Sequence, residues 1–265
     1  MDRPQGKKEN TGTGKKLSLP NVTLAAMTSV NLYETIRAME YSMRGVDFGD
    51  VVLITHRKPL TLPKGIRYSH TSKLDDIDKF NYKMVYELGE HIHTDFALIV
   101  HADGFVVHPE SWRDEFLDYD YIGSPWPLPE NDYAYRDSRG GIVRVGNSVS
   151  IRSKRLLDFP GQAGLKWEKM EEDDNYNEDT FLCCKYRNVM EEAGMRFAPI
   201  EVAKYFGHEH MIPEIMDVEA PFLFHKWRGR NAQYPKFVNP WKVRWQTCKN
   251  VLRPLLFWRR VKVKG

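Results

Sequence analysis

The chain has 265 residues, of which 42% are hydrophobic and 12% aromatic, enough for one sizeable α/β domain with appended segments. No apolar run approaches the roughly 20 residues of a membrane-spanning helix, and the basic N-terminal stretch lacks the apolar centre of a signal peptide. We therefore expect a cytoplasmic protein. The cysteines, Cys183, Cys184 and Cys248, form neither a disulfide framework nor a zinc spacing, which argues against redox chemistry.

The formal net charge of +3 hides two parts of opposite sign. From Lys226 to the end there are twelve Lys or Arg and no Asp or Glu, whereas 27 basic residues stand against 36 acidic ones before Lys226. Apolar side chains, among them Trp241 and Trp245, recur at helical spacing in the basic segment. Such a helix is typical of binding to an anionic membrane surface, with packing on the acidic body as the alternative. Nucleic acid is not an expected partner, because no nucleic-acid-binding module accompanies the charge.

The composition predicts three parts along the chain. Residues 1–19 are rich in Lys, Gly, Thr and Asn, which predicts a disordered basic arm. Residues 20–230 carry most of the apolar pattern and form the expected folded domain. Residues 231–265 form the expected basic amphipathic tail.

Strands and helices alternate in the first part of the expected domain. Apolar runs predict strands over residues 22–27, 51–54 and 96–100, and helical spacing predicts helices over 32–43 and 76–91. Asp76 is expected to cap the second helix. The alternation predicts a largely parallel sheet.

Polar side chains follow three of these strands directly. Thr28 and Ser29 follow the first, His56 the second and Asp103 the third. Ligands bind past the carboxyl ends of strands in open α/β sheets, so we expect these residues in a site. Asp103 is the main candidate, and Gly104 beside it lets the backbone come close to a bound group. The alternative is a capping aspartate in a turn.

Beyond Asp103 the pattern is less regular. Residues 119–126 are expected to be extended, and the polar stretch 127–140 is a long loop of the kind that often serves as a lid or substrate loop. Glycines at 140–141 and at Gly146, which precedes Asn147, bracket a short expected strand. Backbone at such glycines can approach a ligand, although two glycine turns flanking a hairpin strand explain them equally well.

Two acidic residues and one histidine complete the candidates. Glu178 and Asp179 begin an expected helix that ends near Gly194. They suit a helix N-terminus on electrostatic grounds, or a general base that takes a proton from an acceptor hydroxyl. His225 ends an apolar run and is either a structural histidine or a metal ligand.

Several of these segments follow one another in an order that resembles a known family. They are Pro20-Asn21-Val22-Thr23-Leu24, His101-Ala102-Asp103-Gly104-Phe105 with Pro109 and Trp112, Tyr119-Asp120-Tyr121-Ile122-Gly123-Ser124-Pro125-Trp126, Val145-Gly146-Asn147, Ile151-Arg152-Ser153, Glu178-Asp179, Phe197-Ala198-Pro199 and Pro221-Phe222-Leu223-Phe224-His225. Over about residues 20–225 the chain resembles a family of GT-A-type glycosyltransferases associated with surface polysaccharides. Much of that family is catalogued only as a domain of unknown function.

The resemblance implies a fold and a set of ligands. The fold is α/β, a single domain with a GT-A-like, Rossmann-type, mostly parallel sheet flanked by helices, followed by the basic helical tail. The ligands are a nucleotide-sugar donor, UDP-linked in our expectation, a divalent cation, Mn²⁺ or Mg²⁺, and a polysaccharide, glycan or lipid-linked acceptor. The implied enzyme is a hexosyltransferase, inverting if a carboxylate acts as base, at the inner face of a membrane.

The resemblance also implies roles for the candidate residues. Asp103, between Ala102 and Gly104, stands in the place of the acidic motif that binds metal and diphosphate, and His225 matches a histidine that helps to hold the metal. Gly146 and Asn147 stand in a glycine-rich donor or acceptor loop. Asp179 stands in the place of the catalytic base, with Glu178 as the neighbouring candidate. Thr28, Ser29 and His56 would bind the nucleotide sugar.

The chain departs from the family pattern at the acidic motif. It has His101-Ala102-Asp103-Gly104 where the family commonly has Gln-Trp-Asp-Gly, and Gly146-Asn147-Ser148-Val149-Ser150 where the family commonly has Gly-Asn-Gly-Gly-Phe-Ser. The motif therefore has one carboxylate, for which His101 would compensate. The alternative function is a catalytically silent glycan- or membrane-binding protein of the same fold.

Overall fold

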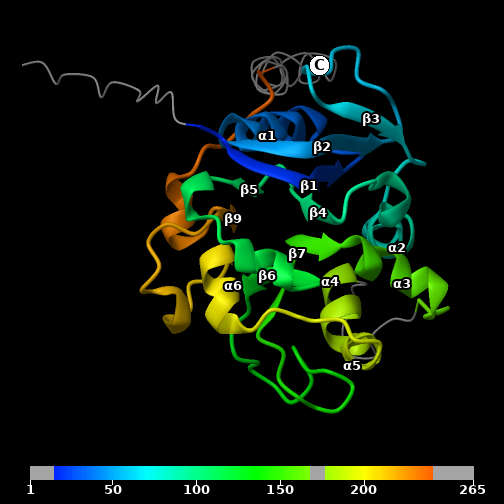
Figure 1. Ribbon diagram of the computed structural model, residues 1–265, viewed down its shortest axis with the longest axis vertical. Helices are drawn as coiled ribbons and strands as arrows, with labels where there is room; N and C mark the ends of the chain where they lie inside the picture. The colour runs from blue at the N-terminus through cyan, green and yellow to red at the C-terminus, as the bar shows by residue number, and fades with distance from the viewer. Residues whose placement is uncertain (1–14, 168–176, 241–265) are drawn as a thin grey trace, which may run out of the picture.

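The computed structural model describes residues 15–167 and 177–240 (Figure 1). Most of the expected N-terminal arm and the part of the expected tail that holds Trp241 and Trp245 lie outside the described residues. The first strand, β1 (Leu17–Met27), begins within the last residues of the expected arm.

Six strands form the central sheet, in the order β3-β2-β1-β4-β7-β6. Their bounds are β1 (Leu17–Met27), β2 (Val46–Thr55), β3 (Arg67–His70), β4 (Phe96–Ile99), β6 (Tyr121–Pro125) and β7 (Val145–Ser153). The first four run parallel, and β7 is antiparallel to both of its neighbours. The expected fold class, an α/β domain with a mostly parallel sheet flanked by helices, is confirmed.

Alternate residues of β1 pack on opposite faces of the sheet. Leu24 and Ala26 belong to one buried cluster with Met39 of helix α1 (Leu32–Gly45), whereas Ala25 and Met27 belong to another with Met84 of helix α2 (Ile77–Tyr86). A strand that is buried on both faces has no polar alternation, which is why its sequence is a continuous apolar run. The helices are α1 (Leu32–Gly45), α2 (Ile77–Tyr86), α3 (Lys154–Gln162), α4 (Glu178–Thr180), α5 (Arg187–Glu192) and α6 (Ile200–Phe206).

The strands and helices expected in the first hundred residues are confirmed, although they begin or end at different residues than expected. The second helix is shorter than expected, because α2 ends at Tyr86 and a 3₁₀ turn, Leu88–His91, follows it. Asp76 caps α2 as expected, by accepting a hydrogen bond from the Lys79 amide at 2.7 Å. The short strand expected before Gly146 is displaced, since β7 starts at Val145 and continues to Ser153.

A second, three-stranded sheet joins distant parts of the chain. Its order is β5 (Gly104–Val106), β9 (Leu223–His225) and β8 (Gly207–His208). The antiparallel pairing of β5 with β9 places Gly104 opposite His225. The small sheet therefore brings His225, at the end of β9, against the turn that carries Asp103.

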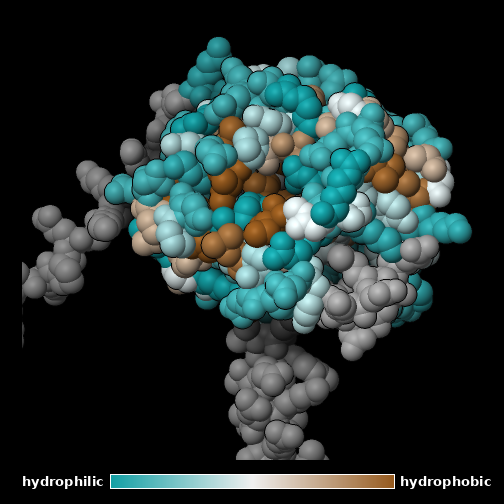
Figure 2. All heavy atoms as spheres, turned by 90° about the horizontal axis from the view of Figure 1, so that it is seen from below, coloured by the Kyte–Doolittle hydropathy of each residue, from teal (hydrophilic) through white to brown (hydrophobic). Residues whose placement is uncertain are grey.

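One edge of the central sheet collects several of the site residues that the sequence predicts. The carboxyl ends of β1, β2, β4 and β6 lie there, together with the amino end of the antiparallel β7. Seen from below, the surface shows apolar side chains in a hollow that hydrophilic residues surround (Figure 2). Within residues 15–167 and 177–240, no helix is long and apolar enough to cross a membrane.

Candidate active site

A cleft of about 1650 Å³ opens at this edge of the sheet. The polar side chains of its lining that the sequence predicts come from five segments of the chain. They are Thr28 and Ser29 after β1, His101 and Asp103 after β4, Asn147 on β7, Glu178 and Asp179 on α4, and His225 on β9. The structure thus brings together most of the site residues that the sequence predicts, and Ala102 also lines the cleft.

Three predicted residues, His56, Gly104 and Gly146, are not among those that line the cleft. His56 contacts the lining residue Ser29, with its Nδ1 atom 3.0 Å from the Ser29 hydroxyl. A Cβ atom on Gly104 would lie 2.8 Å from the His225 ring, and one on Gly146 would lie 2.0 Å from the ring of Trp126. Close packing explains the absence of a side chain at both glycines.

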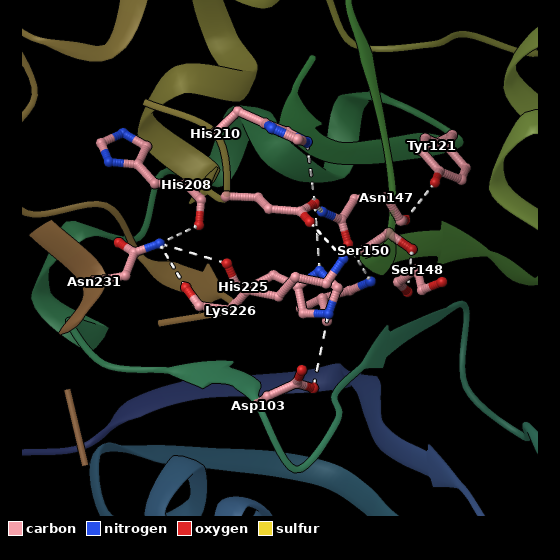
Figure 3. Close-up of polar contacts among 12 residues, drawn as sticks. Asp103, Tyr121, Asn147, Ser148, Ser150, His208, His210, His225, Lys226 and Asn231 are labelled. Atoms are coloured by element: carbon pink, nitrogen blue, oxygen red, sulfur yellow. Dashed lines mark hydrogen bonds and ion pairs between the residues drawn. The ribbon is translucent and has the colours of Figure 1, made fainter. Parts of the chain in front are cut away.

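Asp103 lies on a tight turn between β4 and β5. The amide of His101 donates to the carbonyl of Gly104 at 2.8 Å, and the amide of Gly104 donates back at 3.3 Å. The Asp103 carbonyl accepts a 2.7 Å hydrogen bond from the amide of Lys226, which directly follows β9. These main-chain bonds fix the Asp103 turn against β9. The Asp103 side chain points toward the His225 ring (Figure 3).

His101, Asp103 and His225 form a cluster of potential metal ligands. One ligand atom from each lies within 4.8 Å of the others, and His225 Nε2 is 3.7 Å from Asp103 Oδ1. His101 Nε2 is buried and has no hydrogen-bond partner in the described part of the chain. Burial and the neighbouring His225 lower the pKa of His101 to about 4, so its imidazole is neutral at pH 7. Two imidazoles and a carboxylate are ligands that fit a divalent first-row cation.

Asp179 stands at the start of a helical segment that changes its geometry twice. The α-helical turn α4 runs into a π-helical turn, Phe181–Lys185, and then into α5. The Thr180 amide donates a 2.8 Å hydrogen bond to Asp179 Oδ1. Burial, and then the charge of Glu178, raise the pKa of Asp179 to about 7. A carboxyl group with that pKa at a cleft suits proton transfer near neutral pH.

Glu178 has a different environment from Asp179. Its carboxylate lies 3.1 Å from the guanidinium of Arg152, and the side chains of Glu178 and Arg152 are only 2% and 0% exposed. Arg152 Nε also donates to the Ser150 hydroxyl at 3.1 Å. The carboxylate of Glu178 is therefore held by a buried ion pair, whereas that of Asp179 is available to the cleft.

Comparison with known proteins places this architecture in a family. A family model described as "Protein of unknown function (DUF5672)" matches residues 68–225, more than half of the chain. The chain belongs to the DUF5672 family. This agrees with the expectation of a domain family of unknown function. The match ends at His225 and includes Asp103, Asn147 and Asp179.

Other comparisons add little to the family assignment of this DUF5672 protein. No curated protein matches its sequence. Among solved structures, the apo form of the glycosyltransferase GlyE from Streptococcus pneumoniae TIGR4 is similar at 14% sequence identity and a TM-score of 0.38. That alignment covers 85% of this chain and 60% of the GlyE chain, so the DUF5672 protein spans less than two thirds of GlyE.

The sequence reasoning missed part of the cleft of this DUF5672 protein, namely Glu209, His210 and Lys226. Glu209 is buried, lies 2.8 Å from the ammonium group of Lys226 and accepts a hydrogen bond from the side-chain amide of Asn147. Burial alone would raise the pKa of Glu209, but His225 and Lys226 together lower it to about 2. The available signal was the run His208-Glu209-His210, which puts three potentially charged side chains one residue after the end of α6.

Proposed function

We propose that this DUF5672 protein is a nucleotide-sugar-dependent glycosyltransferase, specifically a hexosyltransferase, with a polysaccharide, glycan or lipid-linked acceptor. One observation supports the proposal most. The cleft holds a cluster of cation ligands, His101, Asp103 and His225, together with Asp179, a carboxyl group whose pKa is about 7. Sugar transfer from a nucleotide sugar needs both kinds of group, one for the leaving diphosphate and one for the attacking hydroxyl.

Asp103 and His225 are the proposed ligands of Mn²⁺ or Mg²⁺, with His101 as a third ligand. Two imidazoles favour Mn²⁺, since Mg²⁺ prefers oxygen ligands. When bound, the cation would supply positive charge to the diphosphate of a UDP-linked donor. Lys226 and Arg228 also line the cleft and add positive charge there.

The donor is proposed to lie along the strand ends. Thr28 and Ser29 present hydroxyl groups to the cleft, and His56 holds Ser29 in place through their 3.0 Å contact. Ala102 contributes main chain at the turn that carries Asp103. Gly146 permits the close packing of Trp126, and Asn147 beside it lines the cleft at the proposed donor or acceptor loop.

Asp179 is the proposed general base. Its carboxylate takes the proton of an acceptor hydroxyl as the hydroxyl oxygen bonds to the anomeric carbon, and the bond from that carbon to the diphosphate oxygen breaks. Direct attack on the face opposite the leaving group inverts the configuration. Glu178, paired with Arg152, acts on Asp179 through its charge and does not itself reach the acceptor.

Nucleotide-sugar binding tests the proposal directly. Melting temperatures of the full chain are measured with a panel of nucleotide sugars, with and without Mn²⁺. A ligand at 100 times its Kd is expected to raise the melting temperature by about 5 °C or more, because it adds about 2.7 kcal/mol to the free energy of unfolding. Asp103→Asn is expected to lose the part of this shift that depends on Mn²⁺. An absence of stabilisation by every donor, or an equal shift in the variant, would contradict the proposal.

The rival function is a catalytically silent glycan- or membrane-binding protein. The observation in its favour is the single carboxylate in the turn between β4 and β5. Product analysis separates the two functions. Formation of a glycosylated product, or hydrolysis of the donor in the absence of an acceptor, shows an enzyme, whereas donor binding with neither reaction supports the rival.

We also propose that the basic segment 231–265 binds the inner face of a membrane. Each Lys or Arg near an anionic surface contributes about 1 kcal/mol, and tryptophans add an apolar contribution. Deleting residues 239–265 is expected to abolish co-sedimentation with anionic vesicles at low salt, while nucleotide-sugar binding persists. Neutral vesicles and high salt are the controls. Equal binding of the full chain to both vesicle types, or to neither, would contradict the membrane proposal.

A further inference from the structure

Glu209 directly follows β8, and its buried carboxylate contacts residues of two other strands that contribute to the cleft. It contacts Asn147 on β7, His225 on β9 and Lys226 directly after β9. We infer that Glu209 is a positioning residue that holds His225 and the adjoining main chain in the geometry that binds a divalent cation. This inference rests on the proposed function, which places the cation at Asp103 and His225.

The imidazole of His225 lies between two carboxylates. Its Nδ1 atom is 3.4 Å from Glu209 Oε2, and its Nε2 atom is 3.7 Å from Asp103 Oδ1 (Figure 3). Nδ1 is buried and makes no hydrogen bond in the described part of the chain, so the Glu209 carboxylate is the charged group that faces it, while Nε2 faces Asp103. Histidine ligands commonly direct their second nitrogen at a carboxylate, which fixes the ring and its tautomer. Glu209 stands where that second carboxylate is needed.

Glu209 also stabilises two uncommon main-chain conformations beside the site. Asn147 and Lys226 have φ angles of 109° and 60°, which residues other than glycine rarely adopt. The side chains of both contact the Glu209 carboxylate. Backbone strain persists only where the surroundings determine it, and here one carboxylate contributes at both positions.

The contact with Lys226 extends this effect to the second proposed ligand. Lys226 Nζ lies 2.8 Å from Glu209 Oε1, and the Lys226 amide donates to the carbonyl of Asp103 at 2.7 Å. Lys226 also directly follows His225 in the chain. Through Lys226, Glu209 thereby holds the main chain that bonds to the Asp103 turn, and it is not itself a member of the group of potential metal ligands.

The test is Mn²⁺ affinity of the full chain, measured by calorimetry without donor or acceptor. Glu209→Gln keeps the size of the side chain and removes its charge, and we expect Mn²⁺ to bind about 10–100-fold more weakly. The matched control is Glu214→Gln, which removes a carboxylate that pairs with Arg144 away from the cluster, and its Mn²⁺ affinity is expected to match the wild type. Melting temperatures in EDTA report any general loss of stability.

The outcomes separate this inference from the proposed function. If the wild type binds no divalent cation, both the cation site and the role of Glu209 are wrong. If the wild type binds Mn²⁺ and Glu209→Gln binds it equally tightly, or only melts at a lower temperature, the role of Glu209 alone is wrong. Glu209→Asp, which keeps the charge on a shorter side chain, replaces Glu209→Gln if the latter does not fold. It is expected to show a smaller loss of affinity, and unchanged affinity would overturn the role.

Discussion

Replacing Asp179 with Asn is expected to lower turnover by about 100-fold or more, which is the scale of losing a general base. An amide has almost the same shape as the carboxylate but cannot take the proton of the acceptor hydroxyl. Donor affinity, measured separately by titration, is expected to stay nearly unchanged. Asp217→Asn is a suitable control, since Asp217 pairs with Lys204 on the surface.

The pH dependence of turnover provides a second measurement of the same role. The pKa of Asp179 is raised to about 7, so the residue is protonated and inactive as a base below that pH and ionised above it. The turnover of the wild type is therefore expected to rise with pH until about 7 and then level off. Asp179→Asn is expected to lose this rise. Near-normal turnover in the variant would remove Asp179 from the mechanism, and a larger kinetic loss in a folded Glu178→Gln variant would identify Glu178 as the base.

Breaking the buried pair between Arg152 and Glu178 is expected to have the largest effect on stability. Glu178→Gln leaves the guanidinium of Arg152 buried with no opposite charge, which costs about 3–5 kcal/mol in the free energy of unfolding. Urea unfolding at pH 7 measures this loss. The surface pair of Arg139 with Glu192, whose side chains are 65% and 64% exposed, is the control, and Glu192→Gln is expected to cost less than about 1 kcal/mol.

The Glu178→Gln variant also tests whether the charge of Glu178 affects the pKa of Asp179. The negative charge of Glu178 contributes to the raised pKa of Asp179, so its removal is expected to move the rise in turnover to lower pH. Similar costs for Glu178→Gln and Glu192→Gln would show that the buried pair contributes no more than a surface pair. An unchanged pH profile in a folded Glu178→Gln variant would show that the two carboxyl groups act independently.

The secondary-structure elements that are set by residues close together in the chain were predictable from sequence. Each of the strands β1, β2 and β4 contains a short apolar run, and the cap at Asp76 depends on an amide only three residues away. The position of Asp103 past β4 follows from the same pattern. By contrast, no local period indicates that β5 pairs with β9, because this contact joins segments that are far apart in the chain.

The same distinction explains the missed parts of the site. Glu209 becomes a site residue only through contacts with Asn147 and His225, both of which come from other strands. The different environments of Glu178 and Asp179 were also hidden, since Arg152 lies on β7 and its guanidinium is buried beneath the cleft. Sequence periodicity predicts which face of a helix or strand is apolar, but it does not predict which charged residue from a distant part of the chain will contact that element.

The π-helical turn after Asp179 contains one residue more than an α-helical turn would contain. Each residue turns an α-helix by roughly 100°, so adding one residue between Phe181 and Lys185 rotates everything before it relative to α5. Shortening that turn by a single residue would swing Glu178 and Asp179 around the helix axis while the buried side chains of α5 kept their places. The geometry of the proposed catalytic site therefore depends on chain length as well as on residue identity. We expect a one-residue deletion within the turn to abolish the proposed activity even though it removes none of the site side chains.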